Sequence, residues 1–178
     1  MDIAEKKGLT IKNLVMTALF IALSLVGSHL KIFGSIAFDS LPGFLAALLL
    51  GPVYGAVIGF LGHIFTALSS GFPLSLPLHL VIAVSMAITM LVFGYAYIVL
   101  KDKLPEVLSL VLTGITGVIL NGPVSLAMSM LTLALLAGRE SAIGLLALLP
   151  ILVIGSAANV LLSLLVFKAL EGVWNKNS

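Results

Sequence analysis

Long uncharged apolar stretches, separated by short polar breaks, make up most of this sequence. Residues 13–30, 107–138 and 141–167 contain no Asp, Glu, Lys or Arg. Between the first two lies another uncharged stretch, residues 40–100, which is too long for one helix. Because a helix that spans a bilayer needs about 20 apolar residues, the pattern predicts several membrane crossings.

The positions of the positive residues decide how many helices the long stretch holds. Three helices, with breaks at Gly51-Pro52 and within residues 69–77, give six crossings with both termini in the cytoplasm. Lysine and arginine favour the cytoplasmic side. That side then carries seven of the nine positive residues: Lys6, Lys7, Lys12, Lys101, Lys103, Lys168 and Lys176. Only Lys31 and Arg139 fall outside, whereas two helices would move four of the seven outside and remove the bias.

The sequence therefore predicts an all-α integral membrane bundle of six transmembrane helices. Their expected bounds are 12–30, 36–50, 53–68, 77–100, 105–134 and 143–170, with outer connections at 31–35, 69–76 and 135–142 and inner ones at 51–52 and 101–104. The second and third helices are short for a bilayer, and proline cannot continue a helix. An intramembrane hairpin of two half-helices is the alternative for this pair.

Composition excludes a soluble domain and several kinds of site. The chain is 61% hydrophobic and 9% charged, against roughly 25% charged residues in soluble domains. The lack of cysteine removes disulfides and thiolate metal sites, and a net charge of +2 is too small to suggest nucleic acid as a partner. We expect one membrane-embedded domain over residues 1–178 in the cell membrane. Its opening MDIAEKKGLTIKN has acids as well as lysines and no following cleavage site, so residues 1–11 are expected to be a retained cytoplasmic segment.

Polar side chains inside this apolar bundle are the candidates for function. An unpaired polar group in lipid costs several kcal/mol, so these side chains should face a cavity or one another, and intramembrane polar residues are functional candidates by default. The predicted helices bring a set of them to the outer half of the bundle. The candidate substrate-binding residues are Asp39, His63, Ser70, Phe72, His79, Asn121, Arg139 and Asn159.

Most of these candidates also have a purely structural interpretation. Asp39 and His79 could cap helices, and His63 could hydrogen-bond a neighbouring helix. Asn121 could hydrogen-bond the backbone freed at the Gly122-Pro123 kink. Arg139 and Glu140 could form a solvated pair, and Asn159 could form a helix–helix hydrogen bond.

Motifs for catalysis are missing from the sequence. It contains no H-E-x-x-H, no G-x-S-x-G and no paired intramembrane carboxylates, so we expect neither an enzyme nor a cofactor. A metal site of His63, His79 and Asp39 is conceivable, but their spacing is not a known ligand pattern and no metal is predicted. Without a P-loop, any ATP-driven step must come from a partner. A self-sufficient secondary transporter is the alternative, and it would need a coupling acid deep in the bundle.

A pair of small residues on the first helix completes the pattern. In TALFIALS, Ala18 and Ala22 lie four apart on one face, which lets another helix approach closely. Six helices, cytoplasmic ends, this alanine pair and outer polar loops resemble the substrate-binding S component of energy-coupling-factor (ECF) transporters, which import vitamins and their precursors in prokaryotes. The most specific part of the resemblance is FDSLPGFLAALLLGPVYGAVIGFLGHIFTALSSGFPLSLPLHL, residues 38–80.

The resemblance implies partners, a mode of action and a choice of substrates. The partners are a transmembrane coupling protein, docked on Ala18 and Ala22, and two ATPases that drive inward release of a substrate bound in the outer half. The metal-specific branch begins with Met-His, whereas this chain begins MDIAEKK. Amides, hydroxyls and imidazoles near phenylalanines suit a largely neutral heterocycle. Residues 38–80 look similar to the branch assigned to α-ribazole, a precursor of vitamin B12; hydroxymethylpyrimidine, pantothenate and pyridoxine are the alternatives.

Overall fold

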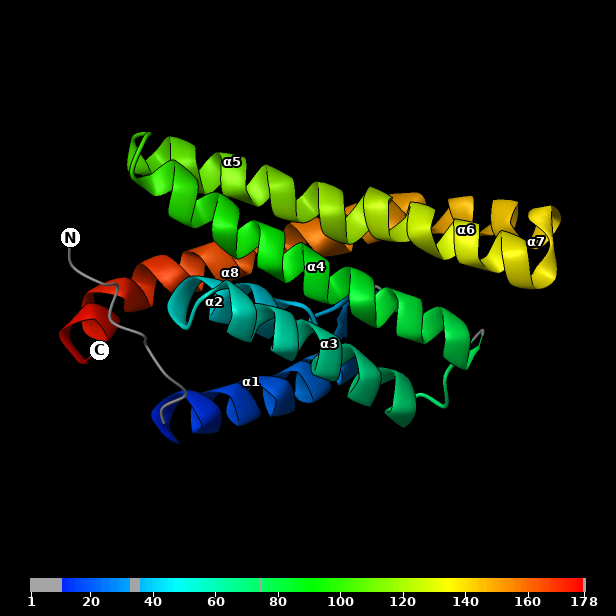
Figure 1. The fold of residues 1–178 in the computed structure, drawn as a ribbon, viewed down its shortest axis with the longest axis horizontal. Helices are drawn as coiled ribbons and strands as arrows, with labels where there is room; N and C mark the ends of the chain where they lie inside the picture. Colours follow the sequence, from blue (N-terminus) through cyan, green and yellow to red (C-terminus); the bar gives the residue numbers. More distant parts are fainter. Residues whose placement is uncertain (1–10, 33–35, 74, 178) are drawn as a thin grey trace, which may run out of the picture.

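Six helical passes along the long axis form the part of the chain that is described, which confirms the predicted all-α bundle (Figure 1). The computed structural model describes residues 11–32, 36–73 and 75–177, so nearly all of the predicted N-terminal segment lies outside the described residues. The elements are α1 (Ile11–His29), β1 (Lys31–Ile32), β2 (Ile36–Ala37), α2 (Leu41–Leu49), α3 (Pro52–Ser69), α4 (Leu76–Lys101), α5 (Glu106–Ile119), the π-helical turn η1 (Leu120–Val124), α6 (Ser125–Ala137), α7 (Arg139–Gly144), the 3-10 turn η2 (Leu145–Leu148) and α8 (Leu149–Asn177).

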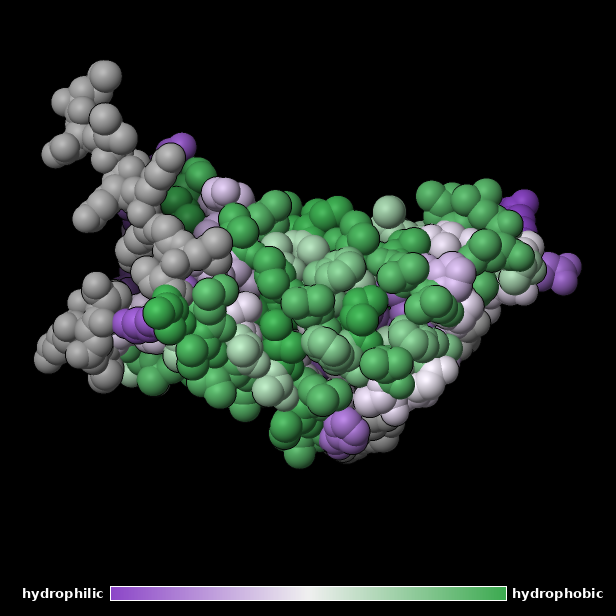
Figure 2. Space-filling view, turned by 60° about the horizontal axis from the view of Figure 1, so that its bottom comes forward, coloured by the Kyte–Doolittle hydropathy of each residue, from purple (hydrophilic) through white to green (hydrophobic). Residues whose placement is uncertain are grey.

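The helices are long and apolar enough to place the bundle in a membrane. Five segments meet the length and hydropathy that a span requires: Ile11–His29, Pro52–Ser69, Leu76–Lys101, Glu106–Ala137 and Arg139–Gly172. Large apolar side chains such as Val111 and Leu161 are more than 45% exposed on their outer surfaces. Figure 2 shows apolar residues over most of one face. Lipid, rather than water, is therefore the solvent that fits this surface.

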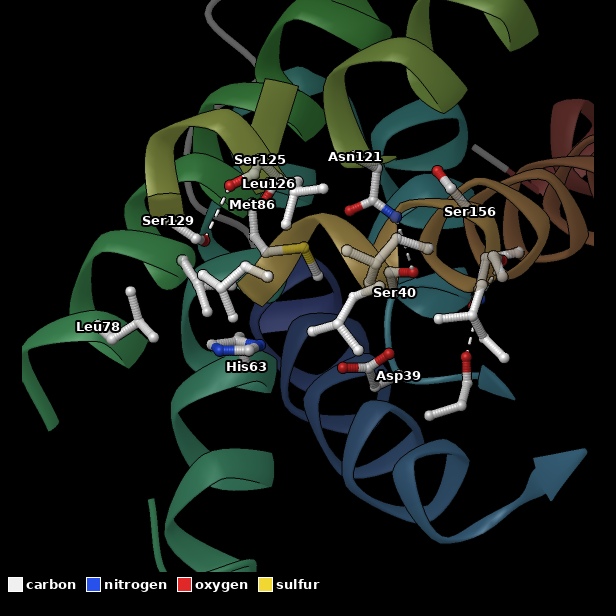
Figure 3. A pocket seen from close by; sticks show the side chains of 18 residues that line it. Asp39, Ser40, His63, Leu78, Met86, Asn121, Ser125, Leu126, Ser129 and Ser156 are labelled. Atoms are coloured by element: carbon white, nitrogen blue, oxygen red, sulfur yellow. Dashed lines mark hydrogen bonds between the residues drawn. The ribbon is translucent and has the colours of Figure 1, made fainter. Parts of the chain in front are cut away.

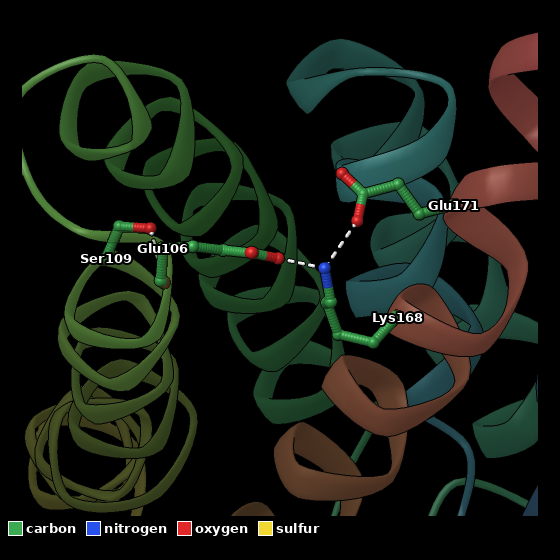
Figure 4. A network of polar contacts seen from close by, with 4 residues as sticks. All are labelled: Glu106, Ser109, Lys168 and Glu171. Atoms are coloured by element: carbon green, nitrogen blue, oxygen red, sulfur yellow. Dashed lines mark hydrogen bonds and ion pairs between the residues drawn. The ribbon is translucent and has the colours of Figure 1, made fainter.

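The bundle has two distinct ends, and an ion pair joins two helices at one of them. Figure 1 places the start of α1 and the end of α8 at one end, here called the terminal end, and the α3–α4 connection and α7 at the other, the distal end. At the terminal end Lys168 pairs with Glu106 at the start of α5 and with Glu171, whose Oε2 lies 2.7 Å from Lys168 Nζ (Figure 4). Which end faces the cytoplasm stays a prediction from the positive residues.

The second pass is shorter than predicted, and the reason lies in its first turn. The sequence predicts a helix over 36–50, but residues 36–37 pair with 31–32 in a short antiparallel ladder and α2 begins only at Leu41. Pro42 has no backbone N–H, so it fits the first helical turn and no later position. Phe38, Asp39 and Ser40 therefore cross the middle of the bundle as non-helical backbone, which in a membrane requires protein partners.

The fifth and sixth passes carry irregular turns, of which the sequence suggests only a kink at Gly122-Pro123. A continuous helix over 105–134 is interrupted by the π-helical turn around Pro123, which cannot donate a helical hydrogen bond. The predicted outer loop 135–142 is also wrong, because α6 continues to Ala137 and α7 starts at Arg139. A single residue, Gly138 with φ +87°, makes the corner between them.

Gly27 on α1 lets residues 38–40, here called the non-helical segment, approach the backbone of α1 closely. Phe38 N donates to Gly27 O over 3.0 Å, and a Cβ at Gly27 would lie 2.3 Å from Phe38 O. Real Cβ atoms do not approach a backbone oxygen so closely, so any side chain at position 27 would displace the chain just before Asp39.

We predict that Gly27→Ala destabilises the bundle whereas Gly172→Ala does not. Overpacking of this kind costs about 1–3 kcal/mol, while a Cβ at Gly172 would meet nothing within 4 Å and alanine is the better helix former. Thermal unfolding of the two purified variants in detergent measures the difference. Equal midpoints for both variants would contradict the close approach at Gly27.

Candidate functional site

One cavity of about 250 Å³ lies in the distal half of the bundle (Figure 3). It is lined from α3, α4, η1, α6, η2, α8 and the non-helical segment before α2. The polar residues of the lining are Asp39, Ser40, His63, Asn121, Ser125, Ser129, Ser156 and Asn159, and its apolar side chains are Ala37, Leu78, Ile82, Met86, Leu126, Leu145, Leu148, Ile151 and Leu152. A concave space with an apolar lining and a few polar groups is typical of small-molecule sites.

Asn159 of α8 holds the non-helical segment in place. Its Nδ2 donates to Ala37 O and to Gly155 O, both over 2.8 Å, and its Oδ1 accepts from Leu41 N over 2.9 Å. The side chain is only 2% exposed. The predicted helix–helix bond is therefore present, and because the amide is engaged with backbone groups, Asn159 acts on the cavity mainly by positioning residues 37–41.

Asn121 enters the lining from the π-helical turn. Its Nδ2 donates to Ser40 Oγ over 3.5 Å, and Figure 3 shows the amide oxygen on the side away from Ser40. Ser125 and Ser129 follow Asn121 on the same helix face at intervals of four residues, and Ser129 Oγ donates to Ser125 O over 2.8 Å. The π-helical turn thus directs a stripe of small polar side chains into the cavity, as such turns often do at functional sites.

His63 joins the cavity to the loop between α3 and α4. Its Nε2 lies 3.1 Å from Nδ1 of His79, and Nε2 of His79 lies 2.6 Å from Pro73 O. The Phe72 ring packs edge-on against His79, with ring centroids 5.9 Å apart. The structural alternative, a bond from His63 to a neighbouring helix, is therefore present beside its place in the lining. Capping does not explain His79, since Ser75 Oγ accepts from Leu78 N at the start of α4.

The structure brings together four of the eight candidates that the sequence suggests. Asp39, His63, Asn121 and Asn159 all line the cavity. Of the others, His79 contacts His63, and Phe72 contacts His79, but neither residue lines the cavity. Ser70 and Arg139 are exposed at the distal end. Among the described residues no cluster of three metal-ligating side chains is found, although Asp39, His63 and His79 were the conceivable set.

Several lining residues were not among the candidates. The serines carry a signal that could have found them, because Asn121, Ser125 and Ser129 repeat every four residues, and Ser156 lies one helical turn before Asn159. The apolar lining, by contrast, has the same composition as the lipid-facing surface, so nothing in the sequence separates the two.

The alanine pair on α1 lies on the outer surface. The helix buries Phe20, Ser24 and Gly27 on its inner side, whereas Ala18 and Ala22 are exposed. Such a small-residue face is open to another helix in the membrane.

Comparison with known proteins agrees with this architecture. The family described as ECF transporter, substrate-specific component, matches residues 12–175, nearly the whole chain. No curated protein and no solved structure matches it. The chain therefore belongs to the substrate-specific components of ECF transporters. It is a multi-pass membrane protein and a substrate-binding transporter subunit rather than an enzyme, and the family implies an ECF module and a small molecule as its partners.

We predict that Asn159→Leu lowers the stability of the bundle by more than Ser156→Ala does. Leucine would leave Leu41 N and Ala37 O unpaired in the interior, at about 1–3 kcal/mol for each group. Ser156→Ala, in the same lining and on the same helix, loses only one bond of 3.4 Å to Val118 O. Thermal unfolding in detergent compares the two variants, and an unshifted midpoint for Asn159→Leu would show that its amide does not hold residues 37–41.

Proposed function

We propose that this S component captures a compact, uncharged vitamin or vitamin precursor in the cavity of its distal half, with that half facing outward. The single observation that carries the proposal is the cavity itself, where polar residues from four separate parts of the chain meet inside an apolar bundle. Its size suits one small molecule rather than a peptide.

The charges of the lining favour an uncharged or hydrogen-bond-donating ligand over an anion. Among the described lining residues Asp39 is the one acid, and none is a lysine or an arginine. Arg139, which could have formed a cationic clamp, is exposed on α7. An anion such as pantothenate would need a cation to replace its lost hydration, so we place it below the other candidates.

The apolar lining defines the rest of the ligand. Met86, Ile82 and Leu126 face the space from α4 and α6, with further leucines from η2 and α8. Apart from His63, the described lining residues include no aromatic ring, so the expected stacking on Phe72 has no support here. Aliphatic side chains can still sandwich a flat ring by dispersion contacts.

These features together favour α-ribazole, in which a ribose is joined to an apolar benzimidazole. The benzimidazole would lie among the aliphatic side chains, and the ribose hydroxyls would donate to Asp39, which is how acids in other proteins bind a ribose. Hydroxymethylpyrimidine and pyridoxine also donate hydrogen bonds and are smaller, so they remain the alternatives.

Import would depend on the ECF module. We propose that the coupling protein docks on the exposed face of α1 at Ala18 and Ala22, and that two ATPases drive release of the bound molecule into the cytoplasm. The exposure of both alanines supports this docking face.

We predict that Asp39→Asn weakens binding of α-ribazole by about tenfold or more, because a carboxylate accepts stronger hydrogen bonds than an amide. Asp102→Asn, an exposed acid near the terminal end of the bundle, is the matched control and should leave the affinity unchanged. Calorimetric titration of the purified protein measures both, together with pantothenate, hydroxymethylpyrimidine and pyridoxine. Binding of pantothenate in preference to the uncharged compounds would contradict the proposed substrate class.

We predict that Ala18→Trp abolishes uptake by the assembled transporter and leaves substrate binding intact. The indole would hold the coupling protein away from α1. Ala169→Trp, an exposed alanine on α8, should support normal uptake. Transport into liposomes with ATP inside, compared for the two variants, tests the docking face. Normal uptake with Ala18→Trp would place it elsewhere, and uptake without any ECF module would favour a self-sufficient transporter.

A further inference from the structure

The hydrogen bonds around His63 and His79 fix which nitrogen of each ring carries a proton. A carbonyl oxygen only accepts, so the 2.6 Å contact with Pro73 O requires a proton on His79 Nε2. In a neutral imidazole the other nitrogen is then bare. His79 Nδ1 is therefore the acceptor of the 3.1 Å bond, and His63 Nε2 is its donor.

The same reasoning determines the second nitrogen of His63. With its proton on Nε2, the neutral ring has a bare Nδ1 that can only accept. His79 is buried, at 9% exposure, and His63 is partly buried. Because burial disfavours a charged imidazole, both rings are expected to be neutral. Among the described residues Nδ1 of His63 has no hydrogen-bond partner, although the ring lines the cavity between Leu78 and Asp39 (Figure 3).

We propose that His63 is a specificity-determining residue whose Nδ1 accepts a hydrogen bond from an O–H or N–H group of the bound molecule, and that His79 and Pro73 hold it in this accepting form. The inference rests on the proposed function of the cavity. It deepens that function by requiring a donor at one defined point of the ligand.

The neighbouring lining groups agree with this requirement. Asp39 offers carboxyl oxygens, and Asn121 turns its Nδ2 to Ser40 so that its amide oxygen is left to accept. The hydroxyls of Ser129 and Ser156 already donate to backbone carbonyls. The cavity is thus rich in acceptors, and a ligand with several donors, such as a ribose, complements it better than one with carboxylates or carbonyls.

Nitrogen-15 NMR of histidine-labelled protein tests the assignment without any ligand, because protonated and bare imidazole nitrogens have well-separated resonances. The chain has three histidines, so samples of His29→Gln and His79→Phe assign the signals. We expect a bare Nδ1 and a protonated Nε2 for His63 in the unsubstituted chain, and a mixture of tautomers in His79→Phe. A proton on Nδ1 of His63 in the unsubstituted chain would overturn the inference.

Binding of α-ribazole and of analogues methylated at one ribose hydroxyl at a time tests the specificity. Methylation of the ribose hydroxyl that donates to His63 Nδ1 should weaken binding about tenfold to a hundredfold, because the methylated oxygen has no proton to donate. In His63→Leu that loss should vanish, because α-ribazole itself then binds as weakly as the analogue. His63→Asn, which keeps an oxygen near the place of Nδ1, should preserve the discrimination.

The two levels of the proposal fail in different ways. If α-ribazole does not bind the unsubstituted protein, the proposed substrate is wrong, and the tautomer measured by NMR still decides the inference about His63. If α-ribazole binds but no methylated position depends on His63, the cavity keeps its function and the inference about His63 is overturned.

Discussion

The rest of the structure depends on one constraint: a bilayer offers no hydrogen bonds to a polar group that reaches it. Each backbone or side-chain polar group within the spans must be paired inside the protein or must face an enclosed space. The chain meets this constraint with helices nearly everywhere. The exceptions gather at the non-helical segment before α2 and the π-helical turn, and these two irregular places lie against the same cavity.

The cavity follows from how the irregular backbone is paired. Because α2 begins halfway along the bundle, its pass leaves room in the distal half, and Asn159 supplies the hydrogen bonds that a helix would have made for Ala37 and Leu41. The π-helical turn around Pro123 brings Asn121 to the same place. The groups that stabilise the non-helical segment therefore also shape the cavity, so a substitution of Asn159 would change both the stability of the bundle and the shape of the proposed site.

The sequence predicts the membrane passes better than the site, and the reason is geometric. Gly51-Pro52 and the break within residues 69–77 mark helix starts locally, so α3 and α4 begin within a residue of their predicted bounds. The start of α2 has a local signal in Pro42, which the predicted helix over 36–50 did not take into account. The hydrogen bonds that hold the preceding residues come from Asn159, more than a hundred residues away, and no local pattern predicts them. Hydropathy likewise indicates how deep a residue lies in the membrane, but it does not indicate whether the side chain faces the cavity or the lipid. Arg139, which the sequence places among the candidates, lies exposed on α7 and does not line the cavity.

The most direct test of the account asks whether a ligand occupies this cavity. The chain has no cysteine, so Ser129→Cys in the lining and Ser141→Cys on exposed α7 each introduce one thiol. Their rates of reaction with a small methanethiosulfonate reagent are measured with and without α-ribazole, hydroxymethylpyrimidine or pyridoxine. The account predicts that one of these compounds slows the reaction of Ser129→Cys and leaves Ser141→Cys unchanged. A Ser129→Cys thiol that reacts at the same rate whether or not each compound is present would contradict it.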